Sequence, residues 1–171
     1  MINALSNKLK ELGRTENGEF KAILKQRLNG KVTDEQAGAI KEFIFLMPPV
    51  MKILISYWKD SKVPGEVKRL GGLLNAYVVR RDDLISDEKL GLFGYLDDSY
   101  IVVSAFLKIQ DKFLRDWQDK SKEEIELTER ARRLINAPRI VIPEEAGKID
   151  EVIELFERGQ ISSFEEYLAA R

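Results

Sequence analysis

The segment from residue 99 to residue 117 places the strongest constraint on the fold. Its first half, from Tyr100 to Leu107, reads Y-I-V-V-S-A-F-L and is apolar on almost every side of a helix. Its second half keeps only one apolar stripe, formed by Ile109, Phe113, Leu114 and Trp117. A helix that is apolar all round has to be covered by other elements. The segment therefore predicts a central helix that is buried at its start and amphipathic toward its end.

Most other apolar residues recur every three to four positions, which is typical of amphipathic helices. Two of these helices begin with a capping box, Thr33 with Gln36 and Ser121 with Glu124. A chain of 171 residues with 44% hydrophobic residues and a net charge of -1 has the composition of one globular domain. We predict an all-α fold, a single compact domain (1–171) of about eight helices around helix 99–117, with N-terminal helices in 1–50 and C-terminal helices in 118–171.

Three local patterns give more detailed predictions. Gly71 and Gly72 lie inside a helical stripe, where each costs about 1 kcal/mol relative to Ala, so we expect a neighbouring helix to approach closely there. The segment 137–143 reads A-P-R-I-V-I-P and is expected to be extended, with a short strand as an alternative. Glu126 and Arg130 are spaced to form an ion pair within one helix.

The chain contains neither Cys nor His. It therefore has no disulfide, no thiolate nucleophile and no imidazole for acid–base catalysis. Any metal ion would have to bind oxygen ligands, which favours Mg²⁺, Ca²⁺ or Mn²⁺. The net charge of -1 supplies no basic field, so we expect no nucleic-acid partner.

The most apolar segment, Phe43 to Trp58, contains Pro48, Pro49 and Lys52. It is shorter than the roughly 20 residues that a membrane-spanning helix needs, and we expect it to be buried core. The first residues, M-I-N-A-L-S-N-K-L-K-E-L-G, are too charged for the apolar region of a secretion signal. We expect a cytoplasmic protein.

Aspartates gather in the irregular part of the chain that precedes the central helix. Residues 82–98 hold six acidic residues against one basic residue. Clustered carboxylates repel one another unless a cation lies between them, and hard divalent cations bind carboxylate oxygens. The pattern therefore indicates a candidate site for Mg²⁺ or another oxygen-bound divalent cation, with Asp83, Asp87, Asp97 and Asp98 as ligands.

The same aspartates also have an architectural interpretation, which we prefer. Asp97 or Asp98 would cap the helix that starts at Ser99, where the helix dipole favours a negative charge. Residues 52–81 hold seven basic residues against two acidic ones, and these can neutralise the remaining acids. The candidates for these ion pairs are Lys68, Arg80 and Arg81.

Three motifs follow one another in the middle of the chain: Y-W-K-D-S-K-V-P-G-E-V-K (57–68), N-A-Y-V-V-R-R-D-D-L-I-S-D (75–87) and G-Y-L-D-D (94–98). In this order they resemble the YkvA-like family of small helical domains, and the match covers about residues 52–109. Arg81 and Ser86 stand where the family has prolines. The resemblance implies a helical fold and carries no established reaction, cofactor or catalytic residue. Some members of the family look membrane-associated.

We expect a non-catalytic protein-interaction or structural module without a cofactor, which binds a protein partner or a second copy of itself. One alternative is a Mg²⁺- or Mn²⁺-dependent enzyme that acts on a phosphoryl-type substrate through the four aspartates. A second alternative is association with a membrane surface through an exposed part of residues 43–58.

Overall fold

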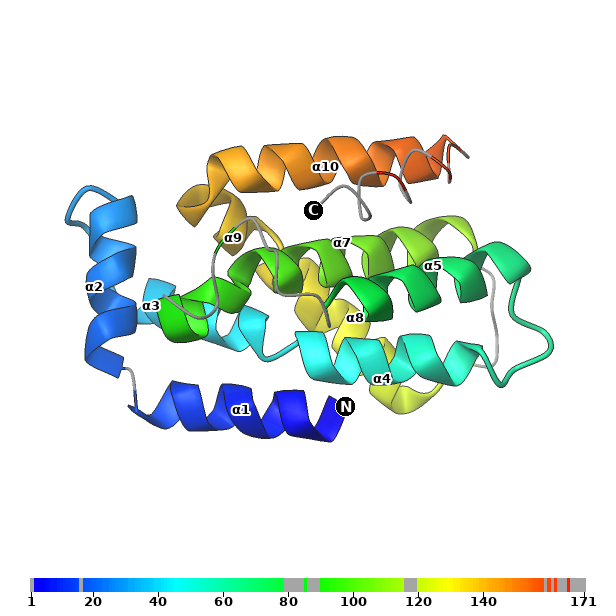
Figure 1. Cartoon of the computed structure of the whole chain (residues 1–171), viewed down its shortest axis with the longest axis horizontal. Helices are drawn as coiled ribbons and strands as arrows, with labels where there is room; N and C mark the ends of the chain where they lie inside the picture. The colour runs from blue at the N-terminus through cyan, green and yellow to red at the C-terminus, as the bar shows by residue number, and fades with distance from the viewer. Residues whose placement is uncertain are drawn as a thin grey trace.

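The computed structural model describes residues 2–15, 17–78, 85, 90–115, 120–158, 160, 162 and 166. Over these ranges the chain forms α-helices and one short 3-10 helix, η1, and contains no strand (Figure 1). The predicted all-α fold is confirmed. The elements are α1 (Ile2–Thr15), α2 (Asn17–Arg27), α3 (Asp34–Ile44), α4 (Met47–Tyr57), α5 (Gly65–Tyr77), η1 (Gly91–Tyr95), α7 (Leu96–Lys112), α8 (Lys122–Leu134), α9 (Asn136–Val141) and α10 (Pro143–Glu157).

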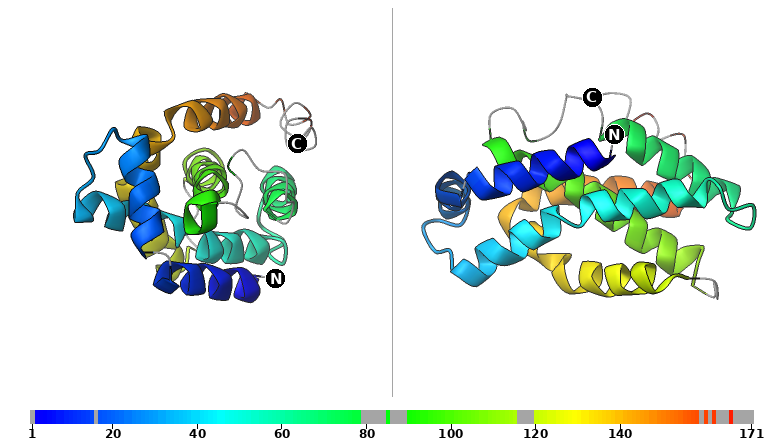
Figure 2. Two further views of the ribbon diagram at one scale, coloured as in Figure 1. Left: turned by 60° about the vertical axis from the view of Figure 1, so that its left-hand side comes forward. Right: turned by 90° about the horizontal axis from the view of Figure 1, so that it is seen from below.

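The central helix is α7, and every residue from Leu96 to Leu107 is buried. Helices α3, α4, α5, α8 and α10 all pack against it. The left view of Figure 2 shows α7 between α4 and α10. The uniform apolar character of its first half is explained by this arrangement, because helices cover α7 on every side.

The predicted ends of the central helix are wrong. The helix begins at Leu96, because Tyr95 at the end of η1 occupies the cap position, so Asp97 and Asp98 lie in the first turn. It ends at Lys112 rather than at residue 117. The carbonyl of Ile109 accepts both the N–H of Phe113 and that of Leu114, at 3.0 and 3.1 Å. These two bonds end the helix, and the Leu114 side chain is buried in the core.

Helices α4 and α5 pack closely at Gly71 and Gly72, as their sequence predicted. A Cβ atom on Gly71 would lie 3.3 Å from the backbone oxygen of Leu54, and one on Gly72 would lie 2.6 Å from the ring of Trp58. Most of residues 43–57 are buried, in agreement with the core prediction, whereas the Trp58 side chain is exposed. In the part of the chain that the structure describes, no helix combines the length and apolar character needed to cross a bilayer.

Two other local predictions are wrong. Residues 136–141 form α9 instead of an extended segment, since Pro138 lies in the first turn, where a backbone N–H has no partner within the helix. Arg130 donates from both Nε and a terminal nitrogen to Glu42 of α3, at 3.2 and 3.1 Å, instead of pairing with Glu126. Glu42 lies on another helix, so the i,i+4 spacing rule, which compares residues within one helix, could not identify this pair.

A buried polar cluster joins α4, α7 and α8. The hydroxyl of Tyr57 donates to Glu124 Oε1 at 2.6 Å, and Gln110 Nε2 donates to the same oxygen at 2.8 Å. Burial, followed by the hydrogen bond to Glu124, raises the pKa of Tyr57 far above its ordinary value. Ser121 caps α8 by accepting the N–H of Glu124, but the Glu124 side chain turns inward to this cluster and does not complete the predicted capping box.

Replacing Glu124 tests how much this cluster contributes to stability. We expect Glu124→Ala to lower the free energy of unfolding by about 3 kcal/mol, because two buried donors lose their acceptor. Glu124→Gln keeps an oxygen acceptor in place and should cost less than half as much. Urea denaturation at pH 7 measures both values. Equal losses in the two variants would contradict the proposed role of the acceptor oxygen.

Candidate functional site

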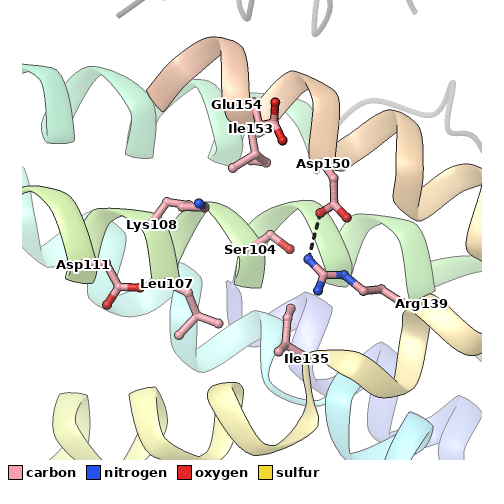
Figure 3. Close-up of a pocket in the computed structure, with 9 residues that line it drawn as sticks. All are labelled: Ser104, Leu107, Lys108, Asp111, Ile135, Arg139, Asp150, Ile153 and Glu154. Carbon is pink, nitrogen blue, oxygen red and sulfur yellow. Dashed lines mark hydrogen bonds and ion pairs between the residues drawn. The ribbon is translucent and has the colours of Figure 1, made fainter. Parts of the chain in front are cut away.

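A pocket of about 280 Å³ lies between α7 and α10, and residues of the α8–α9 junction complete its wall (Figure 3). We call it the α7–α10 pocket. The residues of α7 that line the pocket lie three, four and seven positions after Ser104, and those of α10 lie three and four positions after Asp150. Each set therefore lies on one face of its helix. The pocket is lined by Ser104, Leu107, Lys108, Asp111, Ile135, Arg139, Asp150, Ile153 and Glu154.

Tyr100, Arg139 and Asp150 form a hydrogen-bonded network beside this pocket. The Tyr100 hydroxyl donates to Asp150 Oδ1 at 2.8 Å, and a terminal nitrogen of Arg139 donates to the same oxygen at 3.2 Å. Arg139 Nε donates to the Tyr100 hydroxyl, and the guanidinium lies 5.8 Å from the centre of the tyrosine ring. The network therefore joins α7, α9 and α10 through one carboxylate.

Burial and hydrogen bonds keep the Tyr100 hydroxyl protonated and the Arg139 guanidinium positively charged. Burial, followed by the hydrogen bond to Asp150, raises the pKa of Tyr100 to about 12. Burial by itself would lower the pKa of Arg139, but its hydrogen bonds to Tyr100 and Asp150 outweigh that effect and raise the pKa. Tyr100 is therefore a neutral hydrogen-bond donor, and Arg139 is a fixed positive charge.

Ser104 contributes a hydroxyl group that makes no hydrogen bond within the described part of the chain. The residue lies one helical turn after Tyr100 and is only 7% exposed. Figure 3 shows its hydroxyl on the side of α7 that faces Arg139 and Asp150. A buried hydroxyl without a partner is unfavourable, and such groups in native proteins are uncommon.

The rim of the pocket carries charges of both signs. Asp111 pairs with Arg132 of α8, and Glu154 pairs with Arg158 at 3.2 Å. Lys108 lies one turn before Asp111 on α7, with its ammonium directed toward the pocket (Figure 3). The rim is consequently polar, whereas Leu107, Ile135 and Ile153 provide an apolar wall.

Tyr100 and Arg139 are better suited to binding than to proton transfer. General acid–base catalysis needs a side chain whose pKa lies near the working pH, and neither Tyr100 nor Arg139 meets that condition. Asp150 Oδ1 already accepts two hydrogen bonds. The pocket can therefore position a polar molecule through hydrogen bonds and charge.

The structure places two of the four predicted aspartates. Asp97 and Asp98 are buried in the first turn of α7, where the helix dipole favours their charge, but neither is the cap residue. Asp97 Oδ2 accepts the backbone N–H of Ile85 at 3.0 Å. This bond joins Ile85 to the start of the central helix, which is an architectural role.

The remaining predicted site residues are only partly described. Asp83, Asp87, Arg80 and Arg81 lie outside the described residues, so the four-aspartate cation site stays a prediction. Lys68 lies on α5, and its backbone carbonyl accepts the indole N–H of Trp58 at 2.7 Å. Its ion pair with an aspartate also stays a prediction.

The sequence did not indicate the α7–α10 pocket or its network. The nearest signal was the absence of an apolar residue at Ser104 in an otherwise apolar stretch. Arg139 lay in a segment expected to be extended, and nothing in the sequence indicated that Asp150, which is far away along the chain, would meet Tyr100. Such a contact depends on tertiary packing.

A second surface feature is an apolar groove between α2, α3 and α9, which we call the Ile140 groove. Its volume is about 70 Å³, and no charged residue lines it. Ile140 is 63% exposed and projects from its edge. The groove is lined by Leu28, Gln36, Ala39, Ile40, Ala137, Ile140 and Val141.

No family model, curated protein or solved structure matches this chain. The resemblance to the YkvA-like family therefore stays a prediction.

The network predicts that the Tyr100 hydroxyl ionises at a higher pH than an ordinary tyrosine does. Absorbance at 295 nm, compared between the wild type and Tyr100→Phe, should assign to Tyr100 a transition near pH 12 instead of 10. Because the raised pKa favours the protonated form in the folded chain, Tyr100 stabilises the fold below pH 10, and this contribution is lost between pH 10 and 12. Circular dichroism of the same samples identifies the pH range in which the chain stays folded. A midpoint near 10 in folded protein would contradict the network.

Proposed function

We propose that the protein is a non-catalytic interaction module that acts through protein contacts and associates with a second copy of itself through the Ile140 groove. The observation that carries this proposal is an exposed aliphatic side chain at the edge of an uncharged groove. Ile140 is 63% exposed, and the lining of the groove is aliphatic except for Gln36. Water is a poor environment for such a surface.

The position of Ile140 favours a symmetric pair. In a two-fold dimer the same surface is used by both subunits, so a projecting side chain and the hollow that accepts it must lie on one face. Ile140 and the space lined by Leu28 and Ala39 meet this requirement. A two-fold axis would place each Ile140 in the partner's groove, and the uncharged lining would leave no buried charge without a partner.

The non-catalytic part of the proposal is supported by the described polar groups. The Tyr57–Gln110–Glu124 cluster and the Tyr100–Arg139–Asp150 network are both engaged in hydrogen bonds between helices. Asp97 Oδ2 accepts the backbone N–H of Ile85. Each of these groups therefore helps to hold the fold together.

Sedimentation velocity over a range of protein concentrations tests the dimer. The contact area around one groove is small, so we expect a weak dimer with a dissociation constant of about 10 µM. Ile140→Asp should raise that constant at least about tenfold, because it places a charge against an apolar hollow.

Ile125→Asp is the matched control. Ile125 is another exposed isoleucine, 46% exposed, but it lies on α8 and outside the groove. The dissociation constant should stay unchanged in this variant. A wild-type chain that remains monomeric at the highest concentration, or equal weakening by both variants, would overturn the proposal.

A further inference from the structure

The α7–α10 pocket has a chemistry that the proposed dimer does not use. It combines charges of both signs with an apolar wall, and it contains a buried hydroxyl that lacks a partner in the described chain. The Ile140 groove shares α9 with this pocket but none of its lining residues, so each site can be tested without the other.

Ser104 is the first indication of a ligand. Its side chain is more than nine-tenths buried and faces Arg139 and Asp150 (Figure 3). The chain leaves this hydroxyl without a hydrogen bond among the described residues. A polar ligand atom between α7 and α9 would remove the unfavourable free energy of that group.

Asp150 is the second indication. Among the described residues, Tyr100 and Arg139 donate hydrogen bonds to Asp150, and both bonds use Oδ1. Its side chain is 36% exposed at the pocket, which leaves Oδ2 available to an incoming donor. Arg139 is itself 47% exposed and presents terminal N–H groups to the same space. One acceptor and one set of donors therefore lie side by side.

The balance of charge defines the class of ligand. A simple anion would meet Arg139 and Lys108 but also the carboxylates of Asp111, Asp150 and Glu154. A simple cation would meet the two basic groups. A molecule with one ammonium and one carboxylate can satisfy both sets, with the ammonium at Asp150 Oδ2 and the carboxylate at Arg139 and Ser104.

The apolar wall defines the rest of the molecule. Leu107 and Ile135 lie on one side of the pocket and Ile153 on the opposite side, so an aliphatic or aromatic group can pack between them (Figure 3). A volume of about 280 Å³ is near the lower end of the range for small-molecule sites. We propose that the α7–α10 pocket binds a small zwitterion, an α-amino acid with an apolar side chain.

Two-dimensional ¹H–¹⁵N NMR of the full chain tests this proposal with L-leucine and L-phenylalanine as probes. At least one probe, at about 10 mM, should shift the amide signals of Ser104, Lys108, Arg139 and Asp150. N-acetyl-leucine lacks the ammonium and leucinamide lacks the carboxylate, so each should bind at least about tenfold more weakly than leucine. Glycine, which lacks the apolar group, should also bind more weakly.

Two variants connect the binding to named residues. Asp150→Asn removes the charge that receives the ammonium, and Ser104→Ala removes the hydroxyl without disturbing the Tyr100 network; both should weaken binding by roughly tenfold. Ile140→Asp, in the other site, should leave binding unchanged. If Asp150→Asn fails to fold, Ser104→Ala still decides the question.

Two results would overturn the proposal. The first is the absence of any shift at the pocket with either probe. The second is equal binding of leucine, N-acetyl-leucine and leucinamide, which would show that the charges are not recognised.

Discussion

The burial of α7 is the constraint on which the rest of the structure depends. A buried polar group is stable only with a partner, so two polar side chains of α7, Tyr100 and Gln110, fix the positions of the helices to which they bond. Gln110 meets Tyr57 of α4 and Glu124 of α8 at one end of the helix, and Tyr100 meets Asp150 of α10 at the other. Apolar contact draws the helices together without direction, whereas these bonds select their positions.

The candidate sites follow from that arrangement. Ser104 lies between the two polar clusters of α7, where α10 stands away from it far enough to leave a pocket of about 280 Å³. The same pocket is closed by α9, whose opposite side carries Ile140 and the apolar groove. One short helix therefore contributes Arg139 to a polar site and Ile140 to an apolar one.

The sequence predicted those elements that depend on residues close together in the chain. The apolar run after Ser99 predicted the buried helix, the Thr33–Gln36 capping box is present in full, and Gly71 and Gly72 marked a close helix contact. Features set by packing escaped prediction, because Glu124 turned from its cap to Tyr57 and Arg130 turned to Glu42 on another helix. Asp97 was predicted as a cap or a metal ligand, and its carboxylate accepts the backbone N–H of Ile85. Arg139 and Asp150 are far from Tyr100 in the sequence, so no local pattern indicated that they would meet it.

Native-state hydrogen exchange tests the central role of α7 most directly. If α7 is the centre of the fold, the amides from Ile101 to Ile109 exchange only when the whole chain unfolds, with the free energy that urea denaturation gives for global unfolding. Most of α1 is exposed or half-buried, so its amides should exchange through smaller openings. Faster exchange in α7 than in α1 would contradict the account.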